Sequence, residues 1–327
     1  MFASYATSFN SLPRRALLAV AAATLVSGCM TIGPDFAEPK VQETAAYRHL
    51  DNTAADSARL PSTWWTAFND ATLNTLEERA LSDSPGAKAA AQRLLQAQAQ
   101  LGVVRAGQAP SVSVSAGVSN SRTSSETSQG LALGHRSIEG NNFSVGASLS
   151  YELDLWGRVR RVVEAADAGA LAAQNDRDGV LLMLTGQVAQ SYWQLRGLDA
   201  ERAILANALA ARREAQELIE ARFDAGLSNE LDVSRTRIER ANAEADLHEV
   251  ERQRNLVEHA LAILVGTSPS APLLAPAAKP ALPLPPTIPV GLPASLLSQR
   301  PDLAASVANL RSANARWAWR KAPSTRR

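Results

Sequence analysis

The 327-residue chain is predicted to be mainly α-helical, with long antiparallel coiled-coil helices, one β-hairpin and the start of an internal repeat. Residues 159–265 contain no proline, and apolar side chains recur along them every 3.5 positions. Residues 143–156 alternate between apolar and polar side chains, which is the pattern of a strand. Residues 81–99 match residues 297–315 at a constant offset. These observations predict half of an internally repeated α/β subunit.

Residues 1–28 are predicted to be a signal peptide. Arg14 and Arg15 form a basic region, and the apolar run 16–26 that follows is too short to span a membrane. Val-Ser-Gly-Cys at residues 26–29 resembles the lipidation signal of bacterial lipoproteins, so Cys29 is the expected lipid attachment site. A chance cysteine at a cleavage site is the alternative. No aspartate follows Cys29, which by the same resemblance points to the outer membrane.

Residues 29–70 are expected to form an irregular, lipid-anchored segment. The first repeat is assigned to residues 71–265 and begins with a helix that runs from near Ala71 to about Ala106. Asn69 or Asp70 would cap this helix. Trp64, Trp65 and Phe68 are expected to bury their rings against a helical body.

A β-hairpin is predicted within residues 110–156, with a polar loop over residues 119–142. The apolar face of its second strand begins with Phe143, Val145, Ala147, Leu149 and Tyr151. Such a hairpin could cover a soluble core, or it could place its apolar face against lipid as a membrane strand pair. The hairpin alone favours the soluble interpretation. The lipidation signal and the long helices reverse that preference.

A long helical hairpin is predicted over residues 159–265, with its turn at residues 223–230. Eight of the twelve positions in the first 3.5-residue series are apolar, which favours a coiled-coil seam. Sixty-odd residues at about 1.5 Å each would make a rod of roughly 90 Å. The series consists of Leu181, Leu184, Val188, Ser191, Leu195, Leu198, Arg202, Leu205, Leu209, Arg212, Gln216 and Ile219, and it resumes at Leu247, Val250, Arg254, Val257, Leu261 and Leu264.

Residues 266–292 are predicted to be a proline-rich linker, and residues 293–327 the start of a second repeat. Seven identities fall at an offset of 216, among them Pro85 with Pro301 and Leu94 with Leu310. Residues 317–327 break the helical pattern. A shift of one nucleotide near Arg316 would restore the match, so a frameshifted tail is expected, with a genuine basic tail as the alternative.

Composition argues against nucleic-acid binding and against catalysis. The formal net charge is +1, whereas a nucleic-acid surface needs a basic surplus. The four histidines have no metal-ligand spacing, and no phosphate-binding or dinucleotide-binding motif occurs. We therefore expect no enzyme activity and no cofactor other than a lipid on Cys29.

Several motifs together resemble the outer-membrane efflux factor family, the TolC-like channels, and especially its NodT-type lipoproteins. They occur in the same order as in that family. The matching residues are the Cys29 motif, Gly33-Pro34-Asp35-Phe36, Trp64-Trp65 with Phe68, residues 151–158, residues 223–227, Leu231-Asp232-Val233, residues 292–297 and Arg300-Pro301-Asp302.

The resemblance implies a homotrimer with a shared outer-membrane barrel and a periplasmic helical tunnel, without catalysis. Its partners would be a periplasmic adaptor and an inner-membrane pump, and small molecules such as drugs would leave through it. Ala225, Gly226 and Leu227 match the tip where the adaptor docks, although Gly226 could merely close the helical hairpin. Asp232 matches a position that helps to hold the tip closed.

The resemblance also implies four strands per subunit, whereas this chain predicts two, so the product as written is expected not to conduct. A periplasmic coiled-coil scaffold that binds an adaptor is the rival function, and an inert fragment of a channel gene is another. An alternating strand is the feature that a scaffold would not need.

Overall fold

The structure is a computed structural model that describes residues 31, 33–39, 61–276, 284, 286 and 299–321. The signal peptide with Cys29, most of the proline-rich linker and residues 322–327 lie outside the described residues. The chain divides into two compact units. The hairpin unit comprises residues 1–38, 97–170 and 308–327, and the coiled-coil unit comprises residues 39–96 and 171–307.

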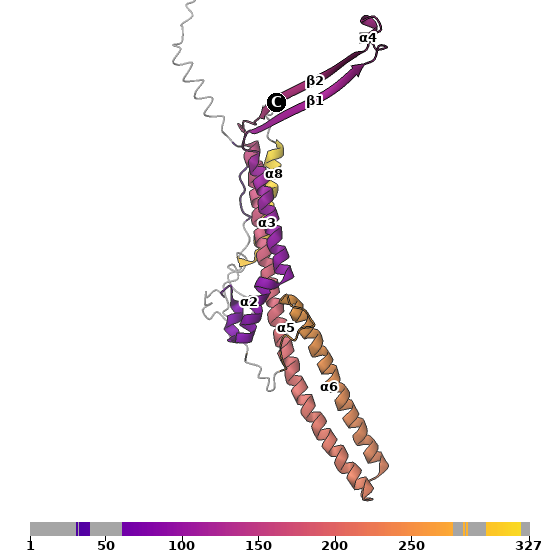
Figure 1. The fold of residues 1–327 in the computed structure, drawn as a ribbon. Helices are drawn as coiled ribbons and strands as arrows, with labels where there is room; N and C mark the ends of the chain where they lie inside the picture. Colours follow the sequence, from indigo (N-terminus) through magenta and orange to yellow (C-terminus); the bar gives the residue numbers. More distant parts are fainter. Residues whose placement is uncertain are drawn as a thin grey trace, which may run out of the picture. The chain divides into compact units, whose positions relative to one another are not determined.

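The described elements are mostly helical and include one pair of strands (Figure 1). Antiparallel pairing joins the two strands into one sheet. In chain order the elements are η1 (Trp64–Phe68), α2 (Ala71–Asp83), α3 (Pro85–Ala106), β1 (Ser111–Thr123), α4 (Ser128–Ala132), β2 (Ile138–Ser150), α5 (Arg158–Asp224), α6 (Glu230–Leu264) and α8 (Pro301–Lys321).

In the coiled-coil unit, Asp70 rather than Asn69 caps α2. The Asp70 side chain accepts hydrogen bonds from the amides of Thr72 and Leu73, whereas Asn69 takes a left-handed conformation at the end of η1. The single helix expected from residue 71 to 106 is interrupted at Ser84, which has an extended ψ of 129°. Pro85 follows and begins α3, since proline disfavours helical geometry in the residue before it and suits a first helical position.

The predicted helical hairpin is confirmed by α5 and α6, which run antiparallel (Figure 1). The seam positions on α5 include the buried residues Leu184, Val188, Leu195, Leu198 and Leu209, whereas Arg212 is exposed. On α6, Val250, Arg254 and Leu261 are buried. The 3.5-residue period therefore marks the faces on which these helices bury side chains, as a coiled coil requires.

The core of the coiled-coil unit lies where η1 and α2 pack with α5 and α6. Leu73, Val188, Leu195, Leu261 and Val265 each have 0% exposure in this cluster. The aromatic residues of η1 contribute as expected, because Trp65 is buried and the Phe68 ring lies 5.4 Å from that of Trp193.

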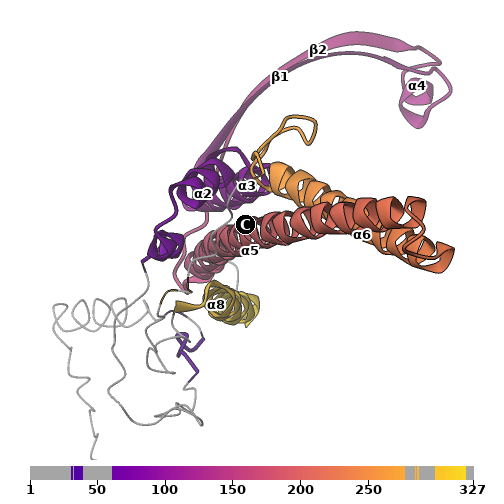
Figure 2. The ribbon, with the colours of Figure 1, turned by 90° about the horizontal axis from the view of Figure 1, so that it is seen from below.

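In the hairpin unit, β1 and β2 pair antiparallel over 13 residues each, with Ser111 opposite Ser150 and Thr123 opposite Ile138. Figure 2 shows the two strands bending together, with the short helix α4 at the far end of the ribbon. The expected polar loop is therefore shorter than residues 119–142, because both strands extend into it.

Helix α8 begins at Pro301 and α3 begins at Pro85, which agrees with the offset of 216 found in the sequence. The expectation that the helical pattern ends at Trp317 is wrong, since α8 continues to Lys321. Ala315 and Ala318 are both buried and extend one packing face across that position. In the part of the chain that the structure describes, no helix is long and apolar enough to cross a membrane.

Candidate functional site: an apolar hairpin face and a helical tip

The register of the hairpin places the apolar residues of segments 111–118 and 143–150 on one face. Directly opposed residues of an antiparallel pair point to the same side of the sheet, and Val112 faces Leu149 while Val118 faces Phe143. The other face carries only serine and glycine between residues 111 and 118. The apolar face consists of Val112, Val114, Ala116, Val118, Phe143, Val145, Ala147 and Leu149, and the polar face of Ser111, Ser113, Ser115, Gly117, Ser144, Gly146, Ser148 and Ser150.

No described residue covers the apolar face. Val145 is 85% exposed and Phe143 is 73% exposed. Exposed apolar area on this scale marks an interaction surface. Within the described residues, the hairpin covers no core with this face. Four of the five predicted membrane-strand residues, from Phe143 to Leu149, belong to β2.

Tyr151 is the exception, because β2 ends at Ser150. Residues 151–157 instead form the corner between β2 and α5. Arg158 donates hydrogen bonds from Nε and from one terminal nitrogen to the two carboxylate oxygens of Glu152, at 2.6 Å each. Alternation in the sequence therefore continues past the end of the strand.

Asp154 caps the start of α5 from the same corner. Its Oδ1 accepts from the amide of Val159 at 3.0 Å, and its Oδ2 accepts from the amide of Arg160 at 2.9 Å. Burial alone would raise the pKa of Asp154, but these hydrogen bonds and the Arg160 guanidinium bring the pKa below its usual value. The corner therefore holds the first turn of α5 next to the end of β2.

At the other end of α5, Gly226 closes the helical hairpin. Its φ is +73°, its amide donates to the Phe223 carbonyl at 2.8 Å, and the Leu227 amide donates to the Arg222 carbonyl at 2.8 Å. This is the Schellman arrangement, which satisfies the last carbonyls of a helix. Leu227 is 73% exposed, so the turn presents an apolar side chain to solvent.

Asp232 lies in the first turn of α6, next to this turn. Its amide donates to the Asn229 side chain at 2.9 Å, and its Oδ2 accepts from the Ser228 hydroxyl at 3.3 Å. Asp232 therefore has a local partner in the structure. The sequence prediction that it holds a tip closed stays a prediction.

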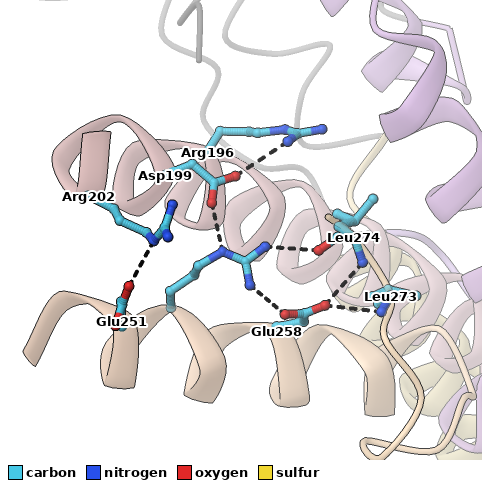
Figure 3. Close-up of polar contacts among 8 residues, drawn as sticks. Arg196, Asp199, Arg202, Glu251, Glu258, Leu273 and Leu274 are labelled. Carbon is cyan, nitrogen blue, oxygen red and sulfur yellow. Dashed lines mark hydrogen bonds and ion pairs between the residues drawn. The ribbon is translucent and has the colours of Figure 1, made fainter. Parts of the chain in front are cut away.

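Sequence reasoning missed a buried polar network in the coiled-coil unit (Figure 3). Arg254 on α6 donates from Nε to Asp199 on α5 at 2.7 Å, and from its terminal nitrogens to Glu258 at 2.6 Å and to the Leu274 carbonyl at 2.9 Å. Glu258 in turn accepts from the amides of Leu273 and Leu274. The signal was an arginine in a row of apolar seam positions.

The network continues along α5 to the cap of α2. Arg196 contacts Asp199 at 3.4 Å and donates to the Tyr192 hydroxyl at 3.2 Å, and Tyr192 donates to Asp70 at 2.6 Å. Burial would raise the pKa of Asp70, but hydrogen bonds from Tyr192 and the two capping amides lower the pKa below its usual value. One chain of polar contacts thus joins α2, α5, α6 and the segment that follows α6.

Glu77 on α2 was also missed. It has 0% exposure, and neither carboxylate oxygen has a hydrogen-bond partner among the described residues. Burial raises its pKa to about 8, so the side chain is mostly protonated at neutral pH. In the described residues, no three histidine, cysteine, aspartate or glutamate side chains are placed to hold a metal ion.

The family model for outer membrane efflux proteins matches residues 76–267. The chain is 30% identical over 298 residues to the pyoverdine export outer membrane protein OpmQ of Pseudomonas aeruginosa. The match covers 89% of this chain and 62% of that protein. It is 28% identical to nodulation protein T of Rhizobium leguminosarum, with 92% of this chain and 60% of that protein covered.

Solved channel structures match the fold. The outer-membrane channel OprN aligns with a TM-score of 0.73 and 28% identity, over 88% of this chain and 63% of that channel. The MtrE channel of Neisseria gonorrhoeae aligns with a TM-score of 0.66 and 28% identity, over 88% and 62% of the two chains. The chain thus spans less than two thirds of the length of these relatives. The matched family model extends over more than half of this chain, from α2 through α6, and the chain belongs to the outer membrane efflux protein family.

Proposed function

We propose that the chain is the outer-membrane channel component of a tripartite efflux system that moves small molecules out of the periplasm. The observation that carries this proposal is the eight-residue apolar face of the hairpin, left uncovered by the described residues and backed by a serine and glycine face. Lipid can cover the first face and water the second, which is the alternation of a membrane strand pair.

The helical hairpin supports a periplasmic role for the rest of the subunit. Helix α5 has 67 residues, which at about 1.5 Å each makes a rod of roughly 100 Å. Charged pairs such as Arg212 with Glu239, at 2.7 Å, join its exposed distal half to α6. A rod with a solvated surface suits a tunnel wall that extends from the membrane into an aqueous space.

The turn at Ala225, Gly226 and Leu227 is the proposed contact with a periplasmic adaptor, which would in turn bind an inner-membrane pump. The exposed Leu227 and the half-exposed Phe223 give the turn an apolar surface. A lipid on Cys29, a homotrimer and a closing role for Asp232 complete the proposal. A relative in Pseudomonas putida is described as a probable efflux pump outer membrane protein, and this supports export as the class of activity.

Two matched lysine substitutions test the membrane placement. Val145→Lys puts a charge on the apolar face, and Ser144→Lys puts the same charge on the neighbouring residue of the polar face. A lysine against the middle of the bilayer costs roughly 2–4 kcal/mol. In a Cys29→Ser background, which removes the proposed lipid, we expect V145K to reduce the amount of chain that resists urea or carbonate extraction from outer membranes, whereas S144K leaves that amount unchanged.

Equal extraction of the two variants and the parent would contradict the proposal and favour a coiled-coil scaffold held to the membrane by lipid alone. Circular dichroism of both variants in detergent checks that the helices remain intact. Ser144 and Val145 are both exposed in the single chain, so neither lysine is expected to disturb packing within the subunit.

A further inference from the structure

We infer that Arg161 clamps the segment Gly33-Pro34-Asp35 to the start of α5 and so fixes the place from which the chain runs back to Cys29. None of the residues of this clamp takes part in the hairpin face or the helical tip. The first half of the inference, the clamp, stands on its own contacts. The second half, the placement of a lipid, rests on the proposed function.

Arg161 is the buried member of the clamp. Its side chain is 5% exposed, and one terminal nitrogen donates to the Gly33 carbonyl at 3.1 Å and to Asp35 Oδ1 at 2.9 Å. The other terminal nitrogen donates to Glu164 at 2.7 Å. A buried guanidinium needs partners for its donors. The segment is therefore held by hydrogen bonds to a buried guanidinium and not by van der Waals packing alone.

Helix α8 holds the same segment from another direction. Asn314 donates from Nδ2 to the Pro34 carbonyl at 3.2 Å. Gly33 has a φ of +92°, and a Cβ placed on it would lie 2.6 Å from the Cβ of Ala318. Only glycine combines that φ with so close an approach. The segment is thus seated in a site formed by α5 and α8.

The corner after β2 also contacts this segment. Gly157 has a φ of +73°, and a Cβ placed on it would lie 2.5 Å from Cγ2 of Thr31. Thr31 is thereby placed against the residue that precedes α5. Two glycines distant in sequence, Gly33 and Gly157, are both required for one seated segment.

This seating limits where a lipid on Cys29 can enter a membrane. Cys29 precedes Thr31 by two residues, and two extended residues reach at most about 7 Å. An acyl group on Cys29 would therefore begin beside the corner that ends β2. The clamp would therefore keep the attachment point of the lipid close to the end of β2.

Pulsed electron paramagnetic resonance tests the clamp in the full chain. Spin labels are attached at Ala37→Cys, just after the segment, and at Gln98→Cys on the exposed surface of α3 in the same unit. Arg161→Met removes the clamp, and Arg161→Lys keeps the charge but not the fork of donors. Arg105→Met is the matched control, because Arg105 pairs with Asp167 at 2.9 Å on the surface of the same unit, where both side chains are more than half exposed.

We expect a narrow distance distribution in the labelled parent and in R105M. R161M should broaden the distribution by about twofold, and R161K should fall between, as local release of a segment predicts. Gly33→Ala should broaden it as well, with Arg161 still present. If R161M fails to fold by circular dichroism, Gly33→Ala and Asp35→Ala decide, because the Asp35 side chain is 91% exposed and its loss cannot unfold the unit. The clamp is contradicted if G33A keeps a distance distribution as narrow as the parent's and R161M does too. If R161M does not fold, D35A takes its place in this comparison.

Mass spectrometry of the N-terminal peptide of the same preparation tests the lipid separately. An acylated Cys29 supports the placement of the lipid beside the corner. An unmodified Cys29 overturns that placement and the lipoprotein part of the proposed function, and it leaves the clamp to be judged by the spin-label distances.

Discussion

Arg254 and Asp199 form an ion pair at 2.7 Å in which the side chains are 6% and 0% exposed, and this pair joins α6 to α5. An isolated buried charge is strongly disfavoured, so each partner depends on the other. Because Arg254 also contacts Glu258 and the Leu274 carbonyl, the pair fixes the segment that leaves α6 as well.

Arg254→Met should lower the free energy of unfolding by up to about 3–5 kcal/mol, because the buried Asp199 carboxylate loses its 2.7 Å ion pair and keeps the longer one, at 3.4 Å, to Arg196. Urea unfolding followed by circular dichroism measures this change. The control is Arg202→Met: Arg202 pairs with Glu251 at 3.1 Å on the same two helices, but both side chains are more than one third exposed. That pair should contribute no more than about 1 kcal/mol.

Adding Asp199→Asn to Arg254→Met should recover part of the lost stability, because it removes the buried charge that has lost its shorter ion pair. Equal losses for the Arg254 and Arg202 variants would show that burial of the first pair has no energetic weight.

Glu77 makes stability fall as pH rises. Its pKa in the fold is about 8, above the ordinary value of 4.5, so the folded chain binds a proton that the unfolded chain releases. The free energy of unfolding should therefore decrease between about pH 4.5 and pH 8 and then level off, with a total cost of about 3–5 kcal/mol. Unfolding curves recorded across this pH range measure the slope.

Glu77→Leu should remove this slope and raise the free energy of unfolding at pH 8, since Leu73, Leu76 and Ala80 already make that face of α2 apolar. Glu78→Leu is the control on the exposed side of the same helix and should keep the slope. An unchanged slope in E77L would mean that the buried carboxyl does not titrate in this range.

The long elements could be predicted because their periodic patterns repeat over many residues. The 3.5-residue series from Leu181 to Ile219 found the buried face of α5, and alternation from residue 143 found β2. Local interactions could not be predicted from period. β2 ends before Tyr151, next to the corner that holds the fork between Arg158 and Glu152, and Pro85 divides the first helix, although both sequences continue a regular pattern.

The polar sites were harder to predict because their partners are far apart in the chain. Arg254 and Asp199 are separated by 55 residues, and Arg161 and Gly33 by 128. For the pair of Arg254 and Asp199, the available signal was a charged residue, Arg254, at a seam position. Nothing in the local sequence distinguished the buried Arg161 from its neighbours Arg158 and Arg160.

Gly226 and Gly197 should respond to alanine with opposite signs. Gly226 has open space around its Cα and a φ of +73°, so Gly226→Ala adds backbone strain of about 1–2 kcal/mol without a clash. Gly197 lies within α5, also in open space, so Gly197→Ala should stabilise the helix by about 0.5–1 kcal/mol. Thermal unfolding of the two variants gives both signs in one experiment, and a stabilised G226A would contradict the left-handed turn.

Asp154→Ala should lower the free energy of unfolding by about 1 kcal/mol, the usual contribution of a helix cap, because the amides of Val159 and Arg160 lose their acceptor. Asp167→Ala removes a surface carboxylate from the same helix and should have a smaller effect. Hydrogen exchange at Val159 and Arg160 is the sharper readout. Equal exchange in both variants would contradict the capping role.

The most direct measurement is the accessibility of single cysteines along β2 in outer membranes, read with a membrane-impermeant maleimide. Cysteines replace residues 143 to 148 one at a time in the full chain, and lipid-facing and water-facing positions are compared. We expect positions 143, 145 and 147 to stay unlabelled and positions 144, 146 and 148 to react, with all six reacting after detergent extraction. Uniform reaction of all six in the membrane would contradict a lipid-facing hairpin and, with it, the channel role proposed for this chain.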